Sequence, residues 1–149
     1  MSLWRPSVTV AAVIERDGRF LFVEEMQEGR RVLNQPAGHL DPGETLLAAC
    51  AREVMEETAH RFEPAGLVGI YRWHYKPADV TFLRVCFTGR ILGTEDKPLD
   101  KEIHALHWLT PAELKQKSAM HRSPLVQQCL DDYLAGNNFP LTVMSRSYG

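Results

Sequence analysis

The stretch from Gly38 to Thr58, GHLDPGETLLAACAREVMEET, constrains this chain more than any other part of its sequence. When Thr45 to Thr58 is placed on a helix at about 100° per residue, one arc of that helix is mostly apolar. A neighbouring arc carries Glu53, Glu56 and Glu57. We therefore expect one face of the helix to pack against the protein and the next face to present three carboxylates. The apolar arc consists of Leu47, Cys50, Ala51, Val54 and Thr58.

Like charges three and four residues apart on a helix repel each other and destabilise the isolated helix. A divalent cation would offset that repulsion, and carboxylate oxygens suit Mg²⁺, which also binds substrate phosphates. The alternative is an acidic helix face that contacts only water. Two features favour the metal site: the acidic arc lies beside the packing arc, and it follows a glycine-bearing turn, His39 to Gly43.

The same residues resemble the Nudix box, G-x5-E-x7-R-E-U-x-E-E-x-G-U, where U is aliphatic. Gly38, Glu44 and the run Arg52 to Glu57 fit its spacing at every position. The last two positions differ, because Ala59 stands where the family has glycine and His60 where it has an aliphatic residue. If the helix exit is left-handed, alanine costs roughly 1 kcal/mol there relative to glycine.

The resemblance implies a hydrolase of nucleoside diphosphates linked to a variable group, with an α/β/α sandwich around a mixed β-sheet. It also implies a divalent cation, Mg²⁺ or alternatively Mn²⁺, which would neutralise phosphate charge and orient or acidify the attacking water. A carboxylate would then take the proton, and Glu53 is one candidate. The metal ligands implied are Glu53, Glu56, Glu57 and the backbone carbonyl of Gly38, while Arg52 and Glu44 form a structural pair.

The order of apolar runs and turns predicts an α/β fold whose sheet is not all parallel, because hairpins join several strands. Asp17-Gly18 is a hairpin signal, Gln27 to Arg31 is expected to be a polar loop, and Glu63-Pro64 is expected to interrupt the chain. Thr110 and Ser123, each followed by proline, are expected to start helices. The expected strands are Val8–Ile14, Arg19–Glu25, Leu67–Tyr75, Val80–Ile91 and Ala105–Leu109.

Composition narrows the class of partner. The 149 residues include 44% hydrophobic and 24% charged residues, and we expect one domain, residues 1–149. A formal net charge of −2 argues against binding a nucleic acid polymer by bulk electrostatics, but it permits a small phosphorylated metabolite. The three cysteines are widely spaced and indicate reduced thiols in a cytoplasmic protein, and no apolar run is long enough for a membrane span. The sequence leaves a monomer and a homodimer open.

Three residues outside the box are further candidates. Glu102 lies on a polar loop six residues before Trp108, and several Nudix enzymes have a catalytic or metal-binding acid at a similar distance from a tryptophan; the alternative is a solvated glutamate. Arg84 lies between apolar neighbours in an expected strand, so it serves either a substrate phosphate or an internal salt bridge. Tyr75 shares a strand face with Trp73 and is a candidate for substrate binding, although aromatic residues at this spacing usually belong to the core.

A narrower resemblance is to the NudJ-like phosphatases. It lies in Asn34 to Leu40, Phe82 to Arg84 and Arg122 to Val126. It implies hydrolysis of nucleoside tri- or diphosphates, or thiamine-related pyrophosphates, with release of orthophosphate. The alternatives are a non-catalytic Nudix-type regulatory module, disfavoured by the intact acidic set, and RNA decapping, disfavoured by the absence of a basic tail.

Overall fold

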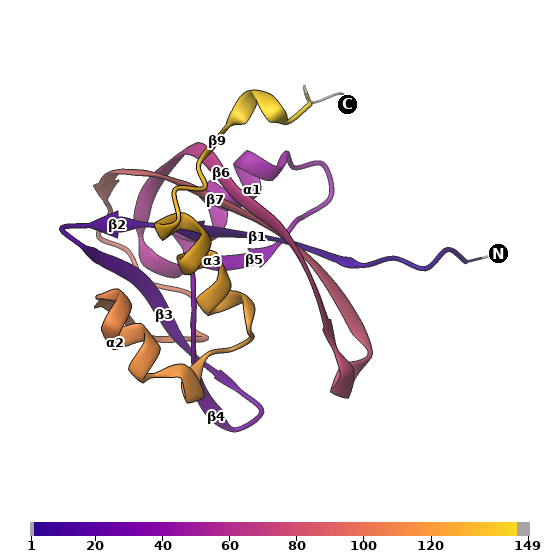
Figure 1. Ribbon diagram of the computed structural model, residues 1–149, viewed down its shortest axis with the longest axis horizontal. Coiled ribbons are helices and arrows are strands. Elements are labelled where there is room, and N and C mark those ends of the chain that lie inside the picture. Colours follow the sequence, from indigo (N-terminus) through magenta and orange to yellow (C-terminus); the bar gives the residue numbers. More distant parts are fainter. Residues whose placement is uncertain (1, 146–149) are drawn as a thin grey trace.

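The computed structural model describes residues 2–145 and consists of two β-sheets with helices packed around them (Figure 1). The larger sheet has the strand order β5-β1-β7-β6-β9, and the smaller sheet has the order β2-β3-β4 with β8 paired to β3. In the larger sheet β1 runs parallel to β7, whereas every other neighbouring pair is antiparallel. The predicted mixed α/β fold is therefore confirmed.

The strands of the larger sheet are β1 (Ser7–Val13), β5 (Ala37–His39), β6 (His60–Tyr75), β7 (Val80–Thr94) and β9 (Phe139–Pro140). Those of the smaller sheet are β2 (Glu15–Arg16), β3 (Arg19–Gln27), β4 (Arg30–Asn34) and β8 (Ile103–Leu109). The helices are α1 (Leu46–Thr58), α2 (Pro111–Gln116) and α3 (Leu125–Leu134), with short 3-10 turns η1 (Lys76–Ala78), η2 (Ser118–Met120) and η3 (Leu141–Val143).

Alternation along β1 explains how two helices cover the two faces of the larger sheet. Val10 and Ala12 belong to the core cluster that includes buried residues of α1, whereas Ala11 and Val13 belong to the cluster that includes buried residues of α3. Successive side chains of a strand point to opposite faces, so a nearly continuous apolar run is what a strand buried on both faces requires. None of the helices in the described residues is long and apolar enough to cross a membrane.

Two tight hairpins flank β3. Asp17 and Gly18 both have positive φ, 53° and 77°, as the Asp-Gly signal predicts. The polar loop expected from Gln27 to Arg31 is wrong, because Gln27 pairs with Arg30 in the ladder and the turn is only Glu28-Gly29. Those two residues also have positive φ, 51° and 79°, so a second short hairpin replaces the loop.

The interruption expected at Glu63-Pro64 is also wrong, because β6 runs unbroken from His60 to Tyr75. Its pairing with β7 shifts register between Pro64 and Gly66, which indicates a β-bulge. A bulge is one of the few places where a strand tolerates proline, since a ladder hydrogen bond is missing there anyway. Opposite it, a Cβ on Gly89 would lie 2.0 Å from the Glu63 carbonyl oxygen, so the two backbones approach closely.

The helix ends follow local sequence signals. The Thr45 hydroxyl accepts a hydrogen bond from the Ala48 N–H at 3.1 Å and so caps α1. The helix therefore begins at Leu46, one residue later than predicted. Ala59 ends α1 in the left-handed conformation with φ 58°. Thr110 and Glu113 form the expected capping box at α2. The Ser123 hydroxyl instead accepts from the Leu125 N–H at 3.1 Å, while α3 itself starts at Leu125.

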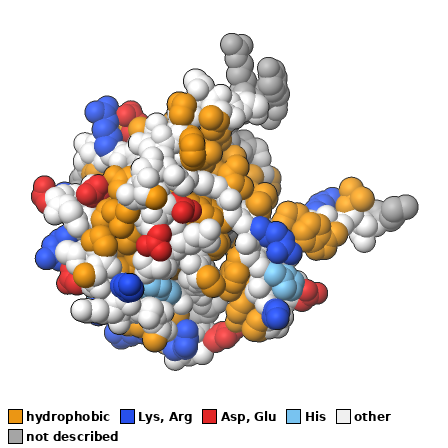
Figure 2. Space-filling model, viewed as in Figure 1, with side chains coloured by type: hydrophobic (Ala, Val, Ile, Leu, Met, Phe, Trp, Pro, Cys, Tyr) orange, Lys and Arg blue, Asp and Glu red, His pale blue; other side chains and the backbone are white. Residues whose placement is uncertain are grey.

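The chain before β1 extends away from the body of the protein as an arm (Figure 1). Figure 2 shows hydrophobic side chains gathered on this arm. Leu3 and Trp4 are 72% and 74% exposed, so the arm does not pack on the core of its own molecule.

Candidate functional site

A cavity of about 420 Å³ opens where the two sheets, α1 and the segment before α3 meet. One part of its lining is acidic: Glu25 from β3, Glu53 and Glu57 from α1, Glu102 from the loop before β8, and Asp41. Gly38 of β5 lies among them. The structure therefore brings the distant Glu102 to the same cavity as the Nudix-box carboxylates Glu53 and Glu57, whereas Glu56 is not part of the lining.

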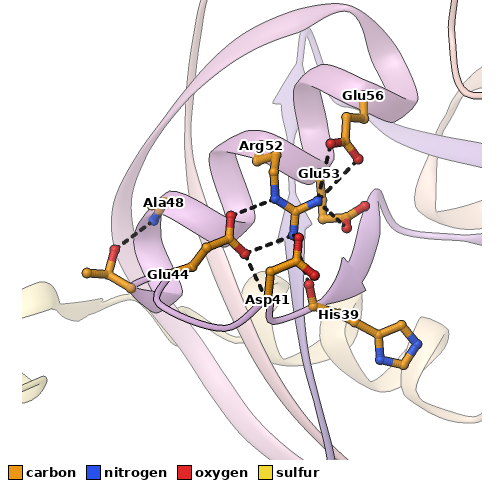
Figure 3. Close-up of polar contacts among 8 residues, drawn as sticks. His39, Asp41, Glu44, Ala48, Arg52, Glu53 and Glu56 are labelled. Carbon is orange, nitrogen blue, oxygen red and sulfur yellow. Dashed lines mark hydrogen bonds and ion pairs between the residues drawn. The ribbon is translucent and has the colours of Figure 1, made fainter. Parts of the chain in front are cut away.

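Arg52 organises the acidic helix face (Figure 3). Its Nε and Nη2 atoms donate to the two oxygens of Glu44 at 2.6 and 2.9 Å, in the bidentate geometry that favours guanidinium–carboxylate pairs. Its Nη1 donates to Glu53 at 2.8 Å and to Glu56 at 3.2 Å. Nη2 also donates to the His39 carbonyl at 2.9 Å, so Arg52 ties the turn before α1 to the helix.

Glu44 completes this link by accepting a hydrogen bond from the Asp41 N–H at 2.9 Å. The hydrogen bond from Arg52, with that from Asp41, lowers the pKa of Glu44 below its usual value. Glu44 therefore remains an anion with its oxygens committed to the turn. This geometry is that of a structural pair, as the family resemblance implies.

The remaining carboxylates lie close together, and Arg52 contacts Glu53 and Glu56 but not Glu57. Burial raises the pKa of Glu53, and Glu56 and Asp100 add like charge. Burial also raises the pKa of Glu57 to about 9, with further contributions from the charges of Glu25, Glu53 and Asp100. The Glu57 carboxylate accepts a hydrogen bond from the Ala37 N–H at 2.9 Å, which partly opposes this shift.

Within residues 2–145, no three acidic, histidine or cysteine side chains are arranged to hold a metal ion as they stand. Glu53 and Glu56 instead point at Arg52, and Glu57 points at the Ala37 backbone. The chemistry of the donor set nonetheless fits a hard cation. A Cβ on Gly38 would lie 2.0 Å from the Glu53 Cδ, so glycine is required for this carboxylate to lie on the Gly38 backbone. Carboxylate and carbonyl oxygens are the ligands that Mg²⁺ prefers.

Arg84 of β7 also lines the cavity and is only 6% exposed. Its guanidinium donates to Asn34 Oδ1 at 2.8 Å and Gln35 Oε1 at 2.9 Å, and it lies 3.8 Å from the Cys129 sulfur. Gln35 in turn donates to the Val126 carbonyl at 2.8 Å, which fixes it to α3. Among the described residues Arg84 has no carboxylate partner, so the internal salt bridge left open by the sequence is not formed there.

Aromatic residues form another part of the lining. Trp73 and Phe82 both line the cavity, and their rings are stacked at 5.7 Å with an interplanar angle of 19°. Tyr75, the aromatic residue singled out from the sequence, is not among the described lining residues. Its hydroxyl donates to Glu28 at 2.6 Å, and its ring lies 5.3 Å from that of Trp73. Tyr75 therefore contacts Trp73, which lines the cavity, and does not itself belong to the described lining.

Sequence reasoning assigned no role to several cavity residues, notably Glu25, Asn34 and Arg122. Glu25 is 7% exposed and forms an ion pair with Arg122. A carboxylate at the end of the apolar strand Arg19 to Glu25 was a usable signal, because a buried charge requires a partner. Nothing local in the sequence marked Arg122 as that partner, since 97 residues separate the two.

Comparisons with known proteins agree with this fold and site. The family model for the NUDIX domain matches residues 3–129. Phosphatase NudJ from Escherichia coli strain K12 is 38% identical over 145 residues, covering 95% of this chain and 92% of that protein. A NUDIX hydrolase from Nitrosomonas europaea superposes with a TM-score of 0.93 at 48% identity, covering 96% of this chain and 98% of that one. The chain therefore belongs to the Nudix family of hydrolases, enzymes that act on phosphoanhydride-containing substrates.

A more distant structure marks the limit of this comparison. A UDP-X diphosphatase superposes with a TM-score of 0.75 at 17% identity, covering 94% of this chain and 68% of that one. At this identity the likeness shows the fold alone.

Proposed function

We propose that this protein is a Mg²⁺-dependent phosphohydrolase of nucleoside tri- or diphosphates, or of thiamine-related pyrophosphates, and that it releases orthophosphate. One observation carries the proposal: carboxylates and a buried arginine without a described carboxylate partner line the same cavity. Oxygen ligands for a cation and a bidentate guanidinium donor for phosphate suit the hydrolysis of a phosphoanhydride bond. The 38% identity to a protein named Phosphatase NudJ supports the narrower substrate class.

The cation would be held by the Gly38 carbonyl and by the carboxylates of Glu53, Glu56 and Glu57, with Mn²⁺ as an alternative to Mg²⁺. When bound, it would neutralise phosphate charge and lower the pKa of the attacking water. Arg52 holds Glu53 and Glu56 on the helix face where these ligands are needed. Arg52 and Glu44 keep the turn carrying Gly38 fixed against α1 and have no catalytic role in this proposal.

Glu102 and Glu53 are the proposed proton acceptors. Both line the cavity. Burial raises the pKa of Asp100, and the negative charges of Glu56 and then Glu102 raise it further, so Glu102 lies close to Asp100. The Asp100 N–H donates to the Glu56 carbonyl at 2.9 Å, so the loop carrying Glu102 is attached to the C-terminal part of α1. That attachment supports a catalytic role for Glu102 over a freely solvated position.

Arg84 would contact a substrate phosphate, and Trp73 would flank the group attached to it, with Tyr75 supporting the Trp73 ring. A small phosphorylated metabolite is thus the proposed partner, rather than a nucleic acid polymer or a membrane. The cysteines Cys50, Cys86 and Cys129 are free and buried, which suits the cytoplasm.

The proposal is tested by a phosphate-release screen over nucleotides, nucleotide sugars, dinucleoside polyphosphates and thiamine pyrophosphates, each with and without inorganic pyrophosphatase. We expect Mg²⁺-dependent orthophosphate release from a triphosphate without pyrophosphatase, with the diphosphate as an intermediate. Glu57→Gln should lower turnover by orders of magnitude, whereas Glu63→Gln, an exposed glutamate paired with Arg90, should leave it unchanged.

Four results would contradict parts of this proposal. Full turnover in excess EDTA, or near wild-type turnover of Glu57→Gln, would remove the metal site. Monophosphate and pyrophosphate as first products would remove the NudJ-like assignment but not the family. Tight binding of a nucleotide without any turnover would instead favour a non-catalytic regulatory module.

A further inference from the structure

A second arginine faces the same cavity as Arg84, and the proposed function does not use it. Arg122 lines the cavity and its Nη1 forms an ion pair with Glu25. Both residues are held by adjoining parts of the small sheet. The Arg122 N–H donates to the Leu33 carbonyl of β4 at 2.9 Å, and Glu25 pairs with Val32 of the same strand.

The next residue along β4 fixes Arg84. Asn34 accepts its hydrogen bond from Arg84, so the backbone of Arg122 and the side chain of Arg84 are attached to consecutive residues, Leu33 and Asn34. Consecutive Cα atoms are about 3.8 Å apart. The strand end therefore directs two guanidinium groups from separate elements to one cavity.

The two members of the ion pair differ in freedom. The Glu25 side chain is 9% exposed, whereas the Arg122 side chain is 38% exposed. A guanidinium has five N–H donors, and within the described residues only Nη1 of the Arg122 side chain has a hydrogen-bond partner. Arg122 can therefore turn towards a ligand without leaving its backbone position, while Glu25 stays fixed in β3.

We propose that Arg122 is a second phosphate-binding residue, that it exchanges Glu25 for a substrate phosphate, and that Glu25 is a positioning residue holding it ready. Two guanidinium groups at one strand end select ligands with at least two linked phosphates, since each can bind a separate phosphoryl group bidentately. This inference rests on the proposed phosphate-binding function of the cavity and extends it to the preference for phosphate number.

The same two strands provide a matched control. Arg31 of β4 donates to Glu24 of β3 at 3.2 Å, and its side chain is 62% exposed. Neither Arg31 nor Glu24 is among the described residues that line the cavity. Removing Arg31 thus breaks a glutamate–arginine pair of the same sheet without removing a cation from the cavity.

The test measures binding of imidodiphosphate, a pyrophosphate analogue with a P–N–P bridge, to the intact protein in Mg²⁺ by calorimetry. Arg122→Gln should weaken binding at least tenfold, Arg122→Lys should weaken it less, and Arg31→Gln should not change it. Glu25→Gln should tighten binding about threefold or more, because the competing carboxylate is gone. That tightening should disappear when Glu25→Gln is combined with Arg122→Gln, because removing the Glu25 carboxylate can help phosphate binding only where Arg122 is present to be released.

The opposite signs separate ligand exchange from a structural ion pair. If Glu25→Gln weakens binding as much as Arg122→Gln does, or both variants melt earlier with no specific binding change, the pair is structural and the proposal is wrong. Equal tightening by Glu25→Gln with and without Arg122 would mean general relief of negative charge, which also overturns it. Failure of the wild-type protein to bind imidodiphosphate would also overturn the proposal.

Binding is measured without turnover, so the two proposals fail separately. A protein that binds imidodiphosphate through Arg122 but hydrolyses nothing in the phosphate-release screen would overturn the proposed function alone. Turnover that is retained with an unchanged KM and an unchanged probe affinity in Arg122→Gln would overturn the role of Arg122 alone.

Discussion

At the residue scale, Arg52 and Arg84 have hydrogen-bond partners of opposite kinds. Arg52 donates to carboxylates, including both oxygens of Glu44, so its charge is neutralised by the residues that hold the turn before α1. Arg84 donates to the neutral amides of Asn34 and Gln35, so its charge is not neutralised by a described neighbour. A buried cation without an anionic partner is costly, and an anionic ligand would relieve that cost.

Arg84 should affect both binding and stability. Arg84→Lys keeps the charge but loses the fork, so we expect kcat/KM to fall about 10- to 100-fold, matching the loss of one charged hydrogen bond. Arg84→Ala should lose more activity. It also leaves the oxygens of Asn34 and Gln35 without a donor, which should cost about 1–3 kcal/mol of unfolding free energy. Kinetics and urea denaturation of both variants would check this; wild-type kcat/KM in Arg84→Lys would contradict it.

Glu102 should affect the chemical step more than binding. If it accepts the proton, Glu102→Gln should lower kcat by about 10²–10⁴-fold with a smaller change in KM. Steady-state kinetics at saturating Mg²⁺ would measure both values. The neighbouring loop residue Glu95→Gln, outside the described cavity lining, serves as the control. A kcat within threefold of wild type would return Glu102 to the role of a solvated loop residue.

At the element scale, the end of α1 is less stable than it could be. Ala59 has φ 58°, a conformation that costs an L-residue with a Cβ roughly 1 kcal/mol relative to glycine. Ala59→Gly should therefore raise the unfolding free energy by about 0.5–1 kcal/mol, or the melting temperature by about 1–4 °C. The same substitution at Ala51, inside the helix, should lower stability by about 0.5–1 kcal/mol. Destabilisation by Ala59→Gly would show that the exit is not strained.

The elements that sequence alone predicted correctly are those set by local chemistry. Asp17-Gly18 makes a hairpin and Thr110 starts α2, because each depends on residues within one turn. The errors came from long-range pairing. Pro64 is accommodated because β6 itself bulges at Ala65 in its pairing with β7, and Glu28 takes a positive φ because β3 and β4 pair around it.

The site divides in the same way. Helical spacing fixes Glu53 and Glu57 on a common face, and both line the cavity, whereas Glu56 is not among the described lining residues. Glu102 could be proposed from the resemblance to Nudix enzymes that have an acid at a similar distance from a tryptophan. The metal-binding and catalytic roles of these residues stay predictions. The place of Arg122 and Trp73 in the cavity could not be predicted, because it depends on how the segment before α3 and β6 pack against the rest of the fold. A single sequence contains no spacing rule for such contacts.

At the scale of the whole molecule, the cavity gathers charge from both sheets and from α1, so binding and folding are coupled. Without a cation, the pKa of Glu57 is raised from an ordinary value of 4.5 to about 9, mainly by burial. Between these two values the folded protein keeps a proton that the unfolded chain releases. The contribution of Glu57 to the free energy of unfolding of the metal-free protein therefore decreases as pH rises through this range.

We accordingly expect the melting temperature of the wild type in EDTA to fall, relative to that of Glu57→Gln, from about pH 5 to about pH 9. Mg²⁺ binds deprotonated carboxylates, so added Mg²⁺ should raise the melting temperature more at about pH 8.5 than at about pH 6. Glu57→Gln cannot ionise at this position, so it should flatten the EDTA profile and weaken the Mg²⁺ effect, whereas Glu63→Gln should reproduce the wild-type curves. Differential scanning calorimetry across pH, with and without Mg²⁺, measures these melting temperatures for the wild type and both variants. A metal-free wild-type profile that does not fall relative to that of Glu57→Gln over this range would mean that Glu57 is not the buried acid linking the cavity to stability.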